Sequence, residues 1–155
     1  EEDNEDAMIK QRPYQYLKTG IFDNRACRNI IETSEEKAHD DEMKRLSKEL
    51  LDYIETNSVW KDCELSITKL SRGTGIPKHQ ITHILNEYIG KNFYTLINGY
   101  RIEAAKRMIT DERYNNYTFI AIAIDCGFNS KTTFYTTFKK ITGTTPTEYK
   151  NRTIA

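Results

Sequence analysis

The chain repeats one pattern of apolar and glycine positions at a constant spacing of 53 residues. The matched pairs are Ile81 with Phe134, Leu85 with Phe138, Gly90 with Gly143, and Leu96 with Tyr149. A short apolar segment that ends in glycine precedes each block, at residues 65–75 and 119–127. We therefore expect the chain to build the same small helical unit twice.

Each repeat has the sequence signals of two short helices joined by a tight turn. Glycine ends the leading helix, and Gly90 or Gly143 ends the helix that follows, because glycine adopts the left-handed conformation of a helix C-terminus without steric cost. Two short helices joined by a glycine-containing turn form a helix-turn-helix. We predict a first unit at about residues 65–92 and a second unit at about residues 118–150.

Side chains that start helices stand at matching places in both units. Ser66 and Thr118 can cap the two leading helices, because a hydroxyl oxygen accepts a hydrogen bond from a backbone N–H group of the first turn. Pro77 favours the start of the later helix in the first unit. In the second unit, either Asn129 or Ser130 can take the capping position.

A long helical stretch at residues 93–110 links the two units. Its apolar side consists of Phe93, Leu96, Ile97, Ile102, Ala105 and Ile109. About 18 residues give a rod of about 27 Å, and successive major grooves on one face of B-DNA lie about 34 Å apart. Such a rod can set two recognition helices into adjacent grooves. No segment alternates polar and apolar residues as a strand does, so the predicted fold class is all-α.

The N-terminal third differs in composition from the rest. Residues 1–12 are acidic and predict a disordered tether, and residues 13–57 predict a helical connector. Within the connector, residues 35–42 predict a solvated charge run and residues 41–57 a helix. The apolar stripe of that helix consists of Met43, Leu46, Leu50, Leu51 and Ile54. Residues 58–155 then form the double helix-turn-helix domain.

The charges are distributed unevenly along the chain, although they sum to zero. Residues 1–57 hold 15 acidic and 9 basic side chains, a net charge of −6. Residues 58–155 hold 8 acidic and 14 basic side chains, a net charge of +6. This asymmetry is typical of proteins in which one part binds a polyanion. It favours nucleic acid as the partner of the basic part.

Composition also excludes several classes of protein for this piece. No apolar run approaches the roughly 20 residues of a membrane-spanning helix, and the acidic start is no secretory signal. We expect a cytoplasmic piece without membrane contact, and the missing initiator Met suggests that it was excised from a longer protein. Three scattered cysteines, Cys27, Cys63 and Cys126, fit a reducing compartment rather than a disulfide framework or a zinc motif. Cys126, among apolar residues, predicts a small buried side chain.

Residues 122–149 form a long and specific motif, IAIDCGFNSKTTFYTTFKKITGTTPTEY. This motif resembles the signature of the AraC/XylS family of transcription regulators. The first half is similar to that family too, in IPKHQITHILN at residues 76–86, GKNF at residues 90–93 and NGYRIEAAK at residues 98–106. The resemblance covers about residues 43–152. It implies two helix-turn-helix units that each place a recognition helix in the major groove of double-stranded DNA.

The resemblance also implies partners. It indicates a regulator of bacterial transcription that helps to recruit RNA polymerase at a promoter. The connector is similar to that of AraC-type regulators whose sensor is a separate membrane-anchored region, so we expect a sensor and dimerisation region upstream of this piece. No cofactor is implied.

Periodicity and the resemblance together assign roles to the side chains of the two recognition helices. The inward faces consist of Ile81, Ile84, Leu85 and Tyr88 in the first helix and Phe134, Thr137, Phe138 and Ile141 in the second. The positions that match the base-contacting residues of the family are His79, Thr82, His83, Lys131, Thr132, Tyr135 and Thr136. The positions suited to the DNA backbone are Lys78, Gln80, Asn86, Ser130, Lys139 and Lys140.

Two positions depart from the family pattern. The family often has arginine where His83 and Thr136 stand, and arginine bound to guanine is the commonest specific contact. The preferred DNA sequence is therefore left open. Gly73 and Gly75 make the C-terminal end of the leading helix in the first unit more flexible, so we expect the first unit to be less rigid than the second.

Other functions find less support in the sequence. His79, His83 and Glu87 lie four residues apart, a spacing that can bind a metal, but the HExxH motif and a nearby cysteine are missing. No catalytic set, Walker loop or GxGxxG motif appears, so we predict that the chain is not an enzyme. The alternative is a helical adaptor that binds only protein. It predicts that charge reversal on the recognition helices leaves binding unchanged.

Overall fold

The computed structural model of the chain describes residues 34–154. Every regular element in that range is helical and no strand occurs there, which confirms the predicted all-α fold class. The α-helices are α3 (Ser34–Thr56), α4 (Ile67–Thr74), α5 (Lys78–His83), α6 (Phe93–Thr110), α7 (Phe119–Asp125), α8 (Lys131–Thr142) and α9 (Pro146–Ile154). Two 3₁₀ turns, η2 (Val59–Lys61) and η4 (Glu112–Tyr114), and a π-helical segment, η3 (Ile84–Ile89), complete the order. The predicted tether and residues 13–33 of the predicted connector lie outside the described residues.

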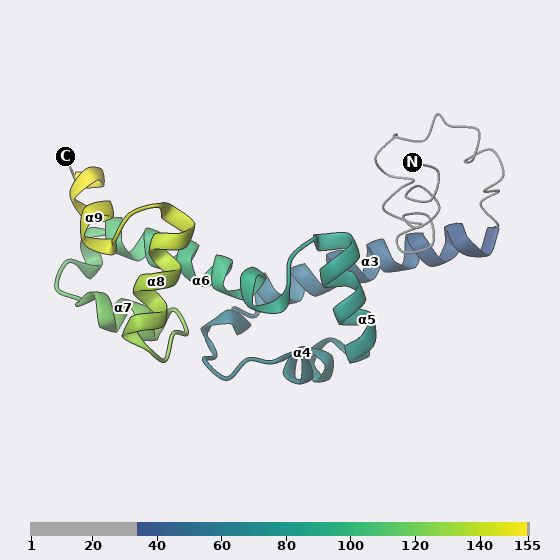
Figure 1. Cartoon of the computed structure of the whole chain (residues 1–155). Coiled ribbons are helices and arrows are strands. Elements are labelled where there is room, and N and C mark those ends of the chain that lie inside the picture. The colour runs from purple at the N-terminus through teal and green to yellow at the C-terminus, as the bar shows by residue number, and fades with distance from the viewer. Residues whose placement is uncertain (1–33, 155) are drawn as a thin grey trace, which may run out of the picture.

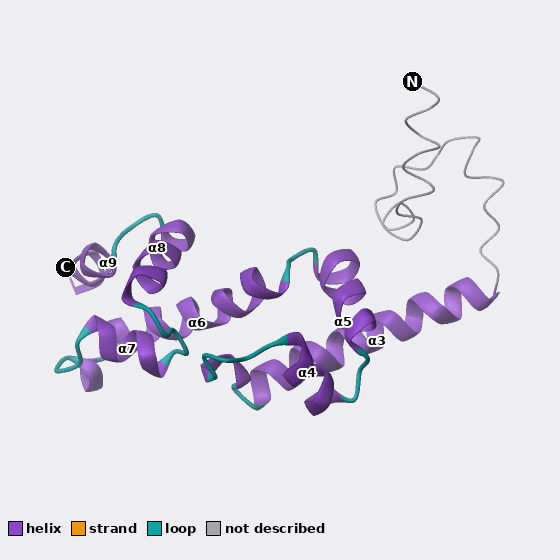
Figure 2. Cartoon of the chain, turned by 60° about the horizontal axis from the view of Figure 1, so that its bottom comes forward, coloured by secondary structure: helices purple, strands orange, loops and turns teal. Residues whose placement is uncertain are grey.

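The described helices form an elongated molecule with a helical unit at each end (Figure 1). The first unit consists of α3, η2, α4, α5 and η3, and the second unit consists of α7, α8 and α9. The linker helix α6 runs between them, and Figure 2 shows the same separation after a 60° turn. The linker starts at Asn92, whose side-chain oxygen accepts a hydrogen bond from the N–H group of Thr95 at 2.8 Å.

Helix α3 begins at Ser34, earlier than the predicted start at residue 41. The charge run at residues 35–42 is therefore helical. Its first turn holds two acidic residues, which interact favourably with the positive end of the helix dipole. Asp40 and Lys44 form an ion pair of 2.6 Å across one turn. Charged side chains have no apolar periodicity, which is why the pattern of apolar residues did not reveal this part of α3.

The apolar stripe of α3 packs against the rest of the first unit. Its buried residues are Met43, Leu46, Leu50 and Ile54, and Leu51 is half-buried beside them. Helix α3 lies along η3, where the Tyr88 hydroxyl donates a hydrogen bond of 2.7 Å to Oδ1 of Asp40. The helix that enters from the N-terminal side therefore rests on the first recognition helix.

Local signals set the helix ends of the first unit where the sequence predicts them. The Ser66 hydroxyl oxygen accepts a hydrogen bond from the N–H group of Lys69 at 3.3 Å, and Gly75 ends α4 with a φ of 76°. Helix α5 follows Pro77 and continues into η3, and Gly90 ends the combined helix with a φ of 73°. A π-helix bonds residues five apart rather than four apart. The first recognition helix is therefore α-helical at its start and π-helical at its end.

The second unit follows the same plan. The Thr118 hydroxyl oxygen accepts a hydrogen bond from the N–H group of Ala121 at 3.1 Å at the start of α7. Of the two candidate caps for α8, Ser130 takes the position, with its hydroxyl oxygen 3.4 Å from the backbone nitrogen of Thr133. Gly143 ends α8 with a φ of 79°. Helix α9 follows, which the sequence analysis did not separate from the second unit.

Aromatic rings form the core of the second unit. Phe134 and Phe138 are fully buried, and their ring centroids lie 5.7 Å apart. Phe128 packs edge-on against Phe134 at 5.3 Å, and Tyr149 of α9 packs edge-on against Phe138 at 5.5 Å. Cys126 is also buried, as predicted, and burial raises the pKa of its thiol to about 11. The predicted burial is confirmed for Phe134, Phe138 and Cys126, and Phe128 is buried beside them.

The prediction that Ile141 faces inward is wrong, because its side chain is 46% exposed. Tyr88 and Thr137, predicted on the same inward faces, are half-buried. Ile141 lies in the last turn of α8, beyond Phe138, on which the aromatic cluster is centred. Periodicity indicates the direction in which a side chain points but not how far the neighbouring helices extend over it.

Three chain segments meet at a point that we call the Arg101 junction, which consists of Trp60, Asp62, Arg101, Gly127 and Phe128. Arg101, in the middle of α6, donates from Nε to the Trp60 carbonyl oxygen at 2.7 Å and from Nη2 to the Asp62 carbonyl oxygen at 2.8 Å. Its guanidinium carbon lies 5.7 Å from the centre of the Phe128 ring. Gly127, between α7 and α8, has a φ of 95°, and a Cβ atom there would overlap the Trp60 carbonyl oxygen. Both units and the linker therefore touch at the junction.

Two glycines should respond to alanine in opposite directions. Gly99 lies inside α6 with nothing within 4 Å of an added Cβ atom, so Gly99→Ala should raise the free energy of unfolding by about 0.5–1 kcal/mol. Gly127→Ala should lower it by about 1–3 kcal/mol, because alanine disfavours a positive φ and its Cβ meets the Trp60 carbonyl oxygen. Urea denaturation followed by circular dichroism measures both values. Midpoints that move in the same direction would contradict this difference in packing.

Candidate nucleic-acid interface

The polar sides of the two recognition helices are exposed to solvent. In the first helix, Lys78, His79, Thr82 and Asn86 are exposed and Gln80 is half-buried. In the second helix, the exposed polar residues are Lys131, Thr132, Thr133, Thr136, Lys139 and Lys140. Most of the predicted DNA-contacting residues therefore lie on two accessible surfaces, one on each unit.

A hydrogen bond inside α5 limits what Thr82 can offer to a partner. Its hydroxyl donates to the carbonyl oxygen of Lys78 at 3.1 Å. The hydroxyl hydrogen is thereby used within the helix, and the lone pairs and the methyl group remain available. These groups suit an amino group on a base edge or the methyl group of thymine.

His83 does not point freely outward as predicted. Its side chain is half-buried, and its Nε2 atom is buried without a hydrogen-bond partner among residues 34–154. The imidazole packs edge-on against the ring of Tyr88, with the ring centroids 5.8 Å apart. His83 is the last residue of α5, and Tyr88 follows five residues later in η3. Residues five apart lie on different faces of an α-helix, so the wider π-helical turn of η3 favours this contact. The Nε2 edge of His83, a predicted base-contacting residue, therefore does not face solvent.

Tyr135 lies at the edge of the polar side of α8. It is half-buried, and its ring packs edge-on against Phe134, with the ring centroids 5.6 Å apart. The Nζ atom of Lys131 lies 5.6 Å from the centre of the Tyr135 ring, within the range of a cation–π contact. Tyr135 therefore holds Lys131 at the start of α8 and also covers part of the core.

The N-terminus of α8 has an environment that favours negative charge. Its first turn contains no acidic residue, and Lys131 is its first residue. The free N–H groups and the helix dipole place partial positive charge at this end. The Ser130 oxygen already accepts the capping hydrogen bond, so only its hydroxyl hydrogen can be donated to a phosphate.

The repeat allows the two recognition helices to be compared position by position. Lys139 and Lys140 occupy the places that Asn86 and Glu87 have in the first unit. Neither lysine forms an ion pair within residues 34–154. The second recognition helix therefore presents more unneutralised positive charge than the first.

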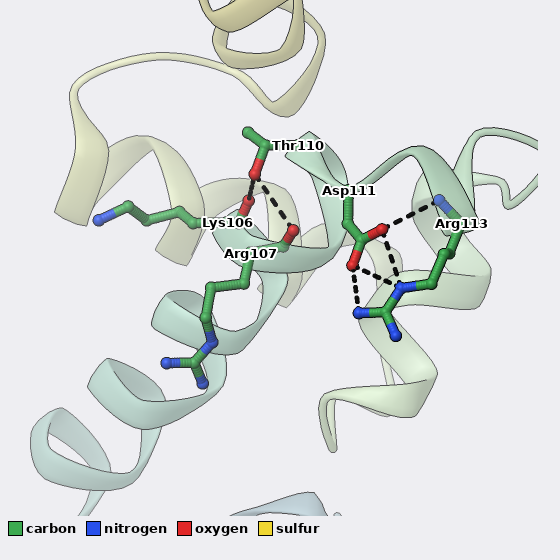
Figure 3. A network of polar contacts seen from close by, with 5 residues as sticks. All are labelled: Lys106, Arg107, Thr110, Asp111 and Arg113. Atoms are coloured by element: carbon green, nitrogen blue, oxygen red, sulfur yellow. Dashed lines mark hydrogen bonds and ion pairs between the residues drawn. The ribbon is translucent and has the colours of Figure 1, made fainter.

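Arg113, in η4 just after α6, has a local partner instead (Figure 3). Arg113 forms an ion pair with Asp111 whose shortest distance is 2.6 Å, and this contact lowers the pKa of the Asp111 carboxyl. The Thr110 hydroxyl is 3.1 Å from the carbonyl oxygens of both Lys106 and Arg107. These contacts stabilise the end of the linker helix and the turn that follows it.

The described residues contain no group suited to a metal ion. Within residues 34–154, no three His, Cys, Asp or Glu side chains lie close enough together to hold one. The helical spacing of His79, His83 and Glu87 therefore does not produce such a group. In the same part of the chain, no helix is both long and apolar enough to cross a membrane.

A sequence model of the AraC-type helix-turn-helix domain matches residues 70–152, just over half of the chain. The chain belongs to this family. The matched range includes both recognition helices and the linker helix α6. The chain is accordingly a DNA-binding domain of the kind found in transcription regulators.

Similar sequences occur in much longer regulators. An uncharacterized HTH-type transcriptional regulator of Staphylococcus aureus (strain COL) is 33% identical over 102 residues, which are 66% of this chain and 13% of that protein. Regulators of the strains MSSA476 and N315 show the same identity and coverage. The matched part of the chain thus spans about 13% of the length of these relatives.

Similar folds occur among solved structures. A protein of unknown function from Listeria innocua has a TM-score of 0.58 and 25% identity, over 67% of this chain and 93% of that one. The C-terminal domain of AraT, a response regulator from Geobacillus stearothermophilus, has a TM-score of 0.56 and 17% identity, over 71% and 84% of the two chains. The C-terminal domain of the two-component response regulator yesN from Fusobacterium nucleatum has a TM-score of 0.51 and 20% identity, over 73% and 98%.

The Arg101 junction was not foreseen from the sequence. Arg101 lies in the NGYRIEAAK motif, but its carbonyl partners at Trp60 and Asp62 stand 41 and 39 residues earlier. One signal was available, because Arg101 stands between Ile97 and Ala105 at steps of four residues. A charged residue in line with the buried side of a helix needs a polar partner from another segment.

Charge reversal at Lys139 should weaken binding to all DNA duplexes alike. A lysine at this position suits a phosphate, and phosphate contacts hold no sequence information. Lys139→Glu should lower the affinity by about tenfold at about 0.15 M salt and reduce the slope of log K against log salt by about 1–2. Fluorescence anisotropy with duplexes of different sequence measures both quantities.

Lys37→Glu is the matched control for this prediction. It makes the same change of charge at an exposed residue of α3, far from α8 in Figure 1, and should keep the affinity within about twofold because salt screens distant charges. A change in sequence preference for Lys139→Glu would refute its assignment to a phosphate.

Proposed function

We propose that this domain binds double-stranded DNA sequence-specifically, with its two recognition helices in adjacent major grooves on one face of the duplex. The observation that supports this most strongly is the presence of two equivalent helices, each with an exposed polar side, at the two ends of one 18-residue helix. Eighteen residues span about 27 Å, which is close to the spacing of about 34 Å between successive major grooves on one face.

Side chains at the start of each recognition helix contact bases in this proposal. The base-contacting residues are His79 and Thr82 on the first unit and Lys131, Thr132 and Thr136 on the second. Tyr135 and His83, both half-buried, contribute at the edges of the two surfaces. The residues that bind the DNA backbone are Lys78, Gln80, Asn86, Ser130, Lys139 and Lys140.

The domain acts in this proposal as the output part of a larger bacterial regulator. Its relatives are several times longer than the part that matches, so an upstream region supplies the sensing of a signal and dimerisation. Binding at a promoter then helps to recruit RNA polymerase. The regulator acts in the cytoplasm, where the DNA is.

Selection from a random duplex library at about 0.15 M salt tests the proposal directly. The full 155-residue chain should enrich two sequence blocks about one helical turn apart, because each recognition helix contacts one major groove. Anisotropy titration of the enriched duplexes should show binding that falls steeply with salt. A single enriched block would refute the two-groove arrangement, and no binding at low salt would favour the protein-binding adaptor.

Removal of one base-contacting side chain should relax the preference at one or two base pairs. Thr136→Ala deletes an exposed hydroxyl and a methyl group, and should reduce discrimination there by about 1 kcal/mol, or roughly fivefold. His79→Ala should act in the same way on the block of the first unit. Repeating the selection with each variant measures the preference at every position.

Thr147→Ala provides the control, because Thr147 is an exposed threonine on α9 and not on a recognition helix. It should leave the preference unchanged. Preferences that stay unchanged in Thr136→Ala and His79→Ala as well would show that other residues contact the bases.

A further inference from the structure

We propose that Arg101 is a positioning residue that fixes the distance and angle between the two recognition helices, and thereby the number of base pairs between the two DNA blocks. This inference rests on the proposed function. It extends that function from the residues that contact bases to a residue that contacts no DNA.

Arg101 contacts both units through one rigid group. Its Nε and Nη2 atoms donate to carbonyl oxygens of the loop that follows α3, at 2.7 and 2.8 Å. The same guanidinium lies over the ring of Phe128, which belongs to the core of the second unit. A guanidinium holds its donors in a fixed plane, whereas a lysine ammonium offers a single centre on a flexible stem. Lysine therefore cannot replace the two hydrogen bonds in this geometry.

The loop that receives these hydrogen bonds contacts α3 and α4 of the first unit. Trp60 is buried in the apolar core. The Asp62 carboxylate accepts a hydrogen bond of 2.7 Å from Nζ of Lys69 in α4 and another of 2.9 Å from the N–H group of Glu64. The contact with Lys69 lowers the pKa of the Asp62 carboxyl. A movement of Arg101 relative to this loop is thus a movement relative to α4.

The second unit reaches the same loop through its backbone. At Gly127 there is no room for a Cβ atom between the main chain and the Trp60 carbonyl oxygen. Figures 1 and 2 both show the turn between α7 and α8 next to the loop after α3. The two units therefore touch directly at the junction, beside the arginine that joins them.

The linker helix by itself is a weaker constraint. Helix α6 packs on α7, α8 and α9 of the second unit, whereas its main contact with the first unit is through η2. Gly99 lies inside α6, where an added Cβ atom would meet nothing within 4 Å, and glycine in a helix interior lowers the stability of the helix. One further contact supports this region, because the Tyr100 hydroxyl donates to Oε1 of Glu55 at 3.0 Å. Without Arg101, fewer contacts would hold α6 and the second unit in place relative to α4 and α5, so the angle between the units would be less tightly fixed.

A fixed junction has a measurable consequence on DNA. One added base pair moves a block by about 3.4 Å along the axis, and it turns the block by about one tenth of a helical turn. A rigid protein therefore matches one separation of the blocks, whereas a protein with a loosened junction tolerates neighbouring separations.

The test uses duplexes with the two selected blocks separated by the preferred number of base pairs, or by one or two more or fewer. The unaltered full chain should prefer one separation by about tenfold, because other separations require the DNA to be twisted or bent. In Arg101→Lys this preference should fall below about threefold. Arg107→Lys, an exposed arginine on the same helix, should keep the full preference.

A duplex with only the block of the second unit separates loss of positioning from loss of folding. Arg101→Lys should bind this duplex with unchanged affinity. If it does not, Gly127→Ala opens the junction from the other side and should flatten the dependence on block separation in the same way. If both variants lose binding to the single block, the junction is needed for folding and the positioning role is refuted.

The outcomes also separate this inference from the proposed function. If the unaltered chain selects two blocks with one preferred separation and Arg101→Lys retains that preference, only the positioning role of Arg101 is overturned. If the unaltered chain does not select two blocks, the proposed function itself fails.

Discussion

The hydrogen bonds from Arg101 to two main-chain carbonyl oxygens hold the two ends of this molecule in one arrangement. Each unit has capped helices and buried side chains, and local signals mark most of its helix ends. They do not determine how one unit faces the other. Burial of the guanidinium lowers the pKa of Arg101 because the charged form is less solvated there. Such burial is tolerated because carbonyl oxygens replace the lost water.

The two units share one helical architecture, but different contacts stabilise their recognition helices. In the first unit, α3 covers the recognition helix, and that helix becomes π-helical where Tyr88 meets His83. In the second unit, a cluster of aromatic rings supports α8, and two lysines stand on its exposed side. The internal repeat is therefore a repeat of architecture and not of surface chemistry. Because the charge at equivalent positions is unequal, we expect the two units to contribute unequally to the proposed binding of DNA.

The sequence alone predicted those features that depend on residues close together in the chain. The caps Ser66 and Thr118, the glycine ends and the burial of Phe134 all follow from local chemistry or helical period. Three kinds of feature could not be found in this way. The charged start of α3 has no apolar period, and the inward turn of His83 depends on a change from α- to π-helix. The contacts of Arg101 join residues about 40 positions apart, which no local pattern encodes.

The packing of α3 on the first recognition helix has a mechanical consequence. The Tyr88 hydroxyl donates a hydrogen bond to Asp40, and the apolar stripe of α3 lies along η3. We therefore expect α3 and the first recognition helix to move together as one rigid body. A torque applied to α3 from the N-terminal side either turns the first recognition helix with it or breaks that hydrogen bond. The second recognition helix receives the same torque only after it has passed through the linker helix or the Arg101 junction. Of the two surfaces proposed to face DNA, the surface of the first unit is therefore the one that is directly coupled to movements of α3.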